Sequence, residues 1–186
     1  MTTISLDAAV SAVLGISGAD EATPRHWAVL EQHFMAQHGD RAAAHEAASE
    51  RVERCRQAMA LLREQRVSQG DNVKPLCELR PNGATLWQWV HLAEVAHAQL
   101  LAKRAQGDEE ALVLGIVAPA GGGKSTLVQV LKLLLRSLLG VSAVEELSLD
   151  DFLSSQAERA EQGIRTRWDL NATNEEAAWR ITYMAD

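Results

Sequence analysis

The sequence predicts an α/β protein, a partial parallel sheet with an all-helical amino-terminal extension. Three observations lead to this fold class. Residues 1–107 have helical periodicity, residues 111–131 pass from an apolar run through a glycine-rich turn into an amphipathic run, and residues 141–149 are interpreted as a second strand. The predicted domains are therefore the helical extension, residues 1–107, and a strand-loop-helix-strand unit, residues 108–186.

Helix start and stop signals divide the amino-terminal extension. Thr23 and Pro24 predict a helix start, because a hydroxyl caps the first turn and proline fits its first position, and Gly39 predicts the end of that helix. Asp40 is expected to cap a second helix that runs to about residue 68. A third helix is expected over about residues 85–106, after a loop that contains two prolines.

Apolar spacing assigns a buried face to the longer helices. Trp27, Trp87 and Trp89 are interpreted as core or inter-helix packing. The second helix is predicted to bury Val52, Cys55, Met59 and Leu62, and the third Leu86, Trp89, Val90, Ala93, Ala96, Leu100 and Leu101. The histidines of this half lack the spacing of a metal site.

The glycine-rich turn has the pattern of a phosphate-binding P-loop. Glycines let backbone N–H groups approach a polyphosphate, a following helix directs its dipole at it, and a lysine neutralises the outer phosphates. Ala118 stands where the pattern G-x-x-x-x-G-K-[ST] has its first glycine. The nucleotide-binding residues predicted here are Ala118, Gly121, Gly122, Gly123, Lys124, Ser125 and Thr126, with Ser125 as a Mg²⁺ ligand.

The alternative to a P-loop is an ordinary turn between a strand and a helix. The context favours the P-loop, because seven aliphatic or small residues, 112–118, precede it as a strand candidate. Leucine and valine then recur at helical spacing to about Gly140, where this helix should end. The cofactors predicted from this motif are ATP and Mg²⁺.

A carboxylate follows the second predicted strand. In open α/β sheets ligands bind beyond the carboxyl ends of the strands, so Asp150 is expected to face the same crevice as Lys124. There it would ligate Mg²⁺ and act as a base toward an acceptor hydroxyl, which makes Lys124 and Asp150 the candidate catalytic residues. The alternative is that Asp150 only caps a helix.

The segments Gly115–Leu127 (GIVAPAGGGKSTL) and Ser148–Phe152 (SLDDF) together resemble the D-glycerate 3-kinases. That family is similar to uridine kinase, phosphoribulokinase and bacterial pantothenate kinase. The resemblance extends over about residues 111–170. It implies a P-loop NTPase fold, with Lys124 in contact with phosphate, Ser125 on Mg²⁺, and Asp150 as base or metal-orienting group.

The chain departs from this family in particular residues and in length. Ala120 replaces a glutamine, and Arg167 and Trp168 replace Thr-His in the substrate-side loop. About 70 residues follow the first predicted strand, whereas the resemblance implies about five strands and later lid arginines. The sequence is therefore expected to lack the carboxyl-terminal part of such a kinase and to support little turnover. A two-stranded sheet would also expose an edge that favours self-association or a partner protein.

Composition limits the function classes. The 186 residues have a net charge of −7 with acidic excess in both halves, so nucleic acid is not an expected partner. No apolar run reaches the ~18 residues of a membrane span. The first 24 residues are acidic rather than basic and apolar, and only two cysteines occur, which favours a cytoplasmic location.

Two functions remain open at this point. The first is an ATP-dependent small-molecule kinase, a transferase that phosphorylates a hydroxyl of a small acceptor such as D-glycerate. The second is a non-catalytic nucleotide-binding or scaffold protein derived from such a kinase. A GTPase is disfavoured because the chain has no N-K-x-D guanine motif.

Overall fold

The computed structural model describes residues 3–16, 18–19, 21–67, 74–119 and 121–147. The chain divides into two compact units, Met1–Val144 and Glu145–Asp186, and every described helix lies in the first. Asp150 lies outside the described residues. The predicted division between residues 107 and 108 stays a prediction.

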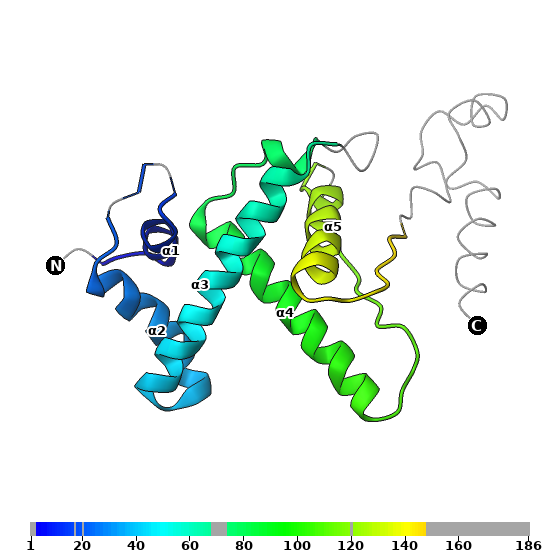
Figure 1. Ribbon diagram of the computed structural model, residues 1–186, viewed down its shortest axis with the longest axis horizontal. Coiled ribbons are helices and arrows are strands. Elements are labelled where there is room, and N and C mark those ends of the chain that lie inside the picture. The colour runs from blue at the N-terminus through cyan, green and yellow to red at the C-terminus, as the bar shows by residue number, and fades with distance from the viewer. Residues whose placement is uncertain (1–2, 17, 20, 68–73, 120, 148–186) are drawn as a thin grey trace. The chain divides into compact units, whose positions relative to one another are not determined.

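Helices make up the regular structure of the first unit (Figure 1). Those described are α1 (Leu6–Leu14), α2 (Pro24–His38), α3 (Arg41–Glu64), the 3₁₀-helical turn η1 (Leu76–Glu78), α4 (Gly83–Ala105), α5 (Lys124–Leu133) and the π-helical turn η2 (Leu134–Leu138). Since η2 directly follows α5, the two form one continuous helical rod.

The predicted start and end of α2 and the predicted start of α3 are confirmed, whereas α3 ends at Glu64 and not at about residue 68. Thr23 is the N-cap of α2, and Gly39 ends it with φ 66°, in the left-handed region that favours glycine. The Asp40 carboxylate accepts a hydrogen bond from the backbone N–H of Ala43 at 3.0 Å, which caps α3. These short-range capping signals set the turn between α2 and α3.

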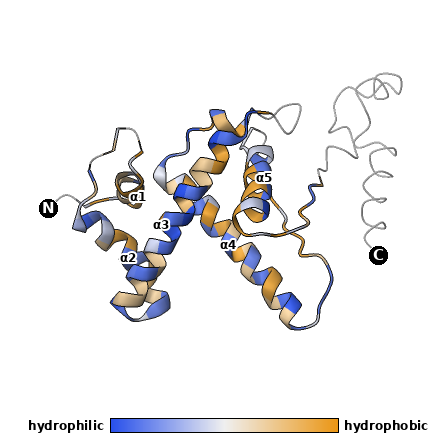
Figure 2. Cartoon of the chain, in the orientation of Figure 1, coloured by the Kyte–Doolittle hydropathy of each residue, from blue (hydrophilic) through white to orange (hydrophobic). Residues whose placement is uncertain are grey.

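One hydrophobic core unites the helices. Leu30 of α2, Val52 and Cys55 of α3, and Trp87 and Val90 of α4 are almost completely buried. Hydrophobic residues, orange in Figure 2, run along α4 and α5. The predicted burial of Trp87 is confirmed, whereas Leu101 near the end of α4 is exposed and its predicted burial is wrong.

Helix α5 packs on the amino-terminal helices. It contacts α4, and η2 contacts both α3 and α4. The buried side chains of this rod are Gln129, Val130, Leu131, Leu133, Leu134 and Leu135. The apolar face of this rod is thus covered by helices.

The predicted α/β class with a partial parallel sheet is wrong, because the described residues contain no strand. Neither strand candidate has regular structure in its described part, which is residues 111–119 for the first and 141–147 for the second. Val113 and Val117 are 86% and 96% exposed, whereas a parallel strand is normally covered on both faces. A strand depends on hydrogen bonds to a neighbouring strand, and neither candidate obtains them in this part of the chain.

A buried ion pair joins α3 to α4. The Arg51 guanidinium lies 2.7 Å from the Glu94 carboxylate and stacks over the rings of Phe34 and Trp87, at 4.6 and 5.3 Å from their centroids. Arg54 contacts the same carboxylate. Because Arg51 is only 8% exposed, removing Glu94 would leave a buried charge without its partner.

The amino-terminal end of α4 is hydrogen-bonded to side chains of α1. The Asp7 carboxylate accepts a hydrogen bond from the N–H of Ala84 at 2.9 Å, and the Ser11 hydroxyl accepts one from the N–H of Gly83 at 3.2 Å. A Cβ on Gly83 would lie 2.6 Å from the Ser11 backbone nitrogen and 2.9 Å from the Asp7 carbonyl oxygen. The contact between α1 and α4 therefore requires glycine at this position.

We expect Gly83→Ala to lower the free energy of unfolding by about 1–3 kcal/mol, because backbone atoms of α1 must shift to admit the methyl group. Urea denaturation followed by circular dichroism measures the change. Gly115→Ala is the matched control, since a Cβ there meets nothing within 4 Å. Equal stability of the two variants would contradict the close packing of α1 on α4.

Stability should also fall as the pH falls below about 6.5, because of His91. Burial, and then the Arg51 charge, lower the pKa of His91 below 6.5. Its Nδ1 is buried without a hydrogen-bond partner among the described residues. The unfolded chain binds a proton near pH 6.5 that the folded chain does not yet bind, so acid favours unfolding. The pKa of His33 is lowered by the same causes, but this residue is exposed at the surface and contributes less.

The measurement is the midpoint of urea denaturation at about pH 7.5 and at about pH 5.5. Ordinary carboxylates titrate below this pH range, so they contribute little to the difference. His91→Gln should make the midpoint less dependent on pH than that of the wild type. An identical pH dependence in wild type and His91→Gln would exclude His91 as the cause.

Candidate phosphate-binding loop

The predicted P-loop lies at the amino-terminal end of α5. The helix begins at Lys124, as predicted, and its N-cap is Gly123, which supplies no side-chain hydrogen bond. The first N–H groups of the helix therefore have no side-chain cap. Such a helix start, with the positive end of the helix dipole, is suited to an anion.

All three glycines of the loop have a conformational or spatial role. Gly121 and Gly123 have φ of 74° and 79°, in the left-handed region that other residues rarely adopt. A Cβ on Gly122 would lie 2.9 Å from the carbonyl oxygen of Pro119, to which the N–H of Gly122 donates at 3.0 Å. Side chains at any of these positions would thus deform the loop.

Lys124 folds back over the loop. Its ammonium group donates hydrogen bonds to the carbonyl oxygens of Ala118 at 2.8 Å and Pro119 at 3.0 Å. These contacts close the loop and hold the positive charge beside the glycines. An anion at the helix start would therefore have a cation within reach.

The other predicted site residues differ in how far the structure describes them. Ser125 is exposed in the first turn of α5, and Thr126 is partly buried beside it. Ser125 is thus accessible for a metal bound with phosphate. Asp150 lies outside the described residues, so its predicted convergence with Lys124 on one crevice stays a prediction.

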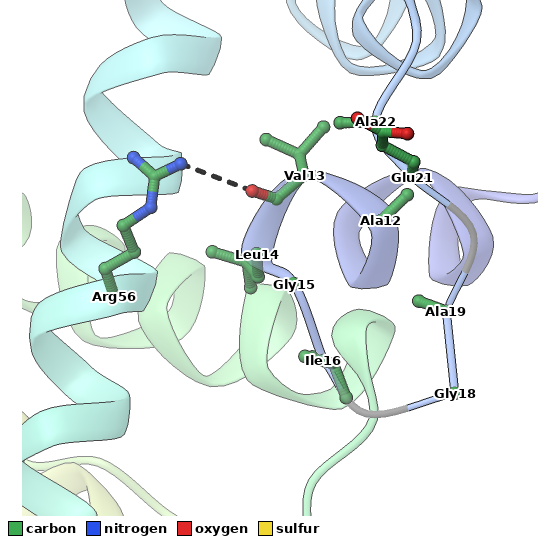
Figure 3. A pocket seen from close by; sticks show the side chains of 10 residues that line it. All are labelled: Ala12, Val13, Leu14, Gly15, Ile16, Gly18, Ala19, Glu21, Ala22 and Arg56. Atoms are coloured by element: carbon green, nitrogen blue, oxygen red, sulfur yellow. Dashed lines mark hydrogen bonds between the residues drawn. The ribbon is translucent and has the colours of Figure 1, made fainter.

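Two hollows in the surface lie elsewhere. The first has a volume of about 620 Å³ and adjoins the carboxyl end of α1, where Arg56 points at the Val13 carbonyl oxygen and donates to it at 3.2 Å (Figure 3). The second, of about 1010 Å³, lies between the carboxyl ends of α1 and α3 and the η1 turn. Neither is lined by residues of the loop, and sequence analysis did not find them because their walls come from segments far apart in the chain.

The described residues offer neither a metal-binding cluster nor a membrane span. No group of three or more His, Cys, Asp or Glu side chains in the described ranges could hold a metal ion. Likewise, no helix of this part of the chain is long and apolar enough to cross a membrane. Comparison of the chain with protein families, curated proteins and solved structures found no match.

Proposed function

We propose that the chain binds Mg-ATP at residues 118–126. The observation that carries this proposal is the coincidence of the sequence A-P-A-G-G-G-K-S-T with a helix that begins at Lys124 and two left-handed glycines before it. Backbone N–H groups, a lysine and a hydroxyl are the set of groups that a magnesium-bound polyphosphate requires. In this proposal Ser125 ligates Mg²⁺ and Lys124 neutralises the outer phosphates.

The reaction that we propose for this site is transfer of the ATP γ-phosphoryl group to a hydroxyl of a small acceptor. Lys124 would stabilise the charge on the transferred group, and Asp150 would orient Mg²⁺ and accept the hydroxyl proton. The resemblance to D-glycerate 3-kinases makes D-glycerate the first acceptor to test. A cytoplasmic location, where ATP and such acceptors occur, belongs to the same proposal.

The second candidate is non-catalytic nucleotide binding in a scaffold protein. It is favoured by the lack of strands in the described residues, because kinase chemistry needs positioning and charge stabilisation from several sides of the phosphate. The exposed Val113 and Val117 would be covered by a second copy or a partner protein under this candidate.

Lys124→Ala should weaken Mg-ATP binding by roughly 10- to 100-fold, the scale of lost hydrogen bonds to a charged group. Isothermal titration of Mg-ATP into the intact chain measures the dissociation constant. Lys132→Ala makes the same change of charge farther along α5 and should bind as the wild type does. Equal affinity of wild type and Lys124→Ala would remove the P-loop interpretation and both candidate functions with it.

The intact chain should release ADP slowly and only with an acceptor, if the site is a kinase site. The assay incubates it with Mg-ATP and D-glycerate, uridine, pantothenate or ribulose 5-phosphate. Asp150→Asn should bind ATP within a small factor of wild type but lower turnover by about 10²-fold, the usual effect of removing a general base. ATP binding without acceptor-dependent ADP release would contradict the kinase and support the non-catalytic candidate.

A further inference from the structure

The hollow between α1, α3 and η1 has an apolar wall. Leu62 and Leu76 are buried at its base, and Leu14, Ile16 and Met59 are partly buried beside them. Its volume of about 1010 Å³ is at the upper end of the range for small-molecule sites. We call this hollow the arginine groove, after the residues at its rim.

Among the described residues, three arginines and one acid, Glu78, line the groove. The Arg80 guanidinium is held by hydrogen bonds to the carbonyl oxygens of Cys77 at 2.7 Å and Leu79 at 2.9 Å. Arg63, in the last turn of α3, and Arg66, just beyond that helix, are both exposed. The rim is therefore cationic in a chain whose net charge is −7.

We propose that the arginine groove binds a small amphipathic anion, a carboxylate or phosphate that carries an acyl chain. The acyl chain would lie on the leucines and Met59, where its burial is favoured by about 0.8 kcal/mol for each CH₂ group. The anionic head would lie at Arg63 and Arg66, because planar guanidinium groups bind carboxylates and phosphates in paired hydrogen bonds. This proposal is independent of nucleotide binding at Lys124.

The cysteines supply a probe for the groove. Cys77 lines it as a half-buried free thiol, and the only other cysteine of the chain is Cys55. Burial, reinforced by the Glu94 charge, raises the pKa of Cys55 to about 12, so its thiol does not react at neutral pH. Alkylation of the folded chain thus reports on Cys77, and a ligand in the groove should slow it.

The experiment titrates laurate, below its micelle concentration, into the intact chain and follows the rate of Cys77 alkylation. Saturating laurate should slow alkylation several-fold, and dodecyltrimethylammonium, which has the same chain with a positive head, should protect much less. The variant Arg63→Gln/Arg66→Gln should raise the dissociation constant for laurate about tenfold, on the scale of charge-assisted hydrogen bonds at an exposed site.

Two controls make this result specific. Arg25→Gln removes one exposed positive charge from α2, outside the groove, and should leave laurate binding unchanged. Lys124→Ala should also retain it, which separates this proposal from the nucleotide site. Because Arg63 and Arg66 are exposed, circular dichroism of the double variant should match the wild type, and each single variant should show part of the loss.

Other outcomes would overturn the proposal. The proposal fails if laurate does not protect Cys77 from alkylation, or if the cationic surfactant protects it equally. It also fails if the double variant has an unchanged dissociation constant for laurate. An acyl anion can be free or part of a membrane lipid, so a parallel arm sediments the chain with phosphatidylglycerol vesicles. Vesicle binding without laurate protection would indicate attraction to a charged surface and would also overturn the groove as a ligand site.

Discussion

The burial of one face of α5 and η2 against α3 and α4 is the constraint on which the position of the glycine-rich loop depends. Each large aliphatic side chain buried there, such as Leu131 or Leu134, contributes about 1.5–3 kcal/mol. The helix that follows the glycine-rich loop needs such a cover, and a sheet is the usual one in α/β proteins. Here the helices of the amino-terminal half supply it. The same packing holds the start of α5 in place, so the loop is formed on an all-helical support.

Sequence-based predictions were accurate where a feature depends on neighbouring residues. They were wrong where it depends on residues far apart in the chain. Capping at Thr23 and Asp40 and the helix start at Lys124 depend on neighbouring residues, and all three were predictable. The strand at residues 112–118 depends on a distant partner, so its aliphatic sequence was not sufficient. Local pattern likewise could not reveal that α5 would pack on helices.

Other features escaped prediction because they depend on how segments far apart in the chain meet. The arginine groove combines the carboxyl ends of α1 and α3 with the turn before α4, and no spacing in the sequence joins Leu14 to Arg80. The close contact at Gly83 is also non-local, since the atoms that exclude a Cβ belong to α1. In the loop, by contrast, the glycines and Lys124 are adjacent in sequence, so the motif alone predicted that they lie together.

The two hydrogen bonds that Lys124 donates to the carbonyl oxygens of Ala118 and Pro119 would make the proposed binding of phosphate an exchange reaction. An incoming group has to offer the ammonium more than two neutral carbonyl oxygens already do. Uncharged ligands would gain nothing from displacing these partners, whereas a multiply charged phosphate gains Coulomb energy as well as hydrogen bonds. Only a ligand with enough negative charge would displace the two backbone carbonyl oxygens from Lys124. The affinity should therefore rise steeply from monophosphate to triphosphate.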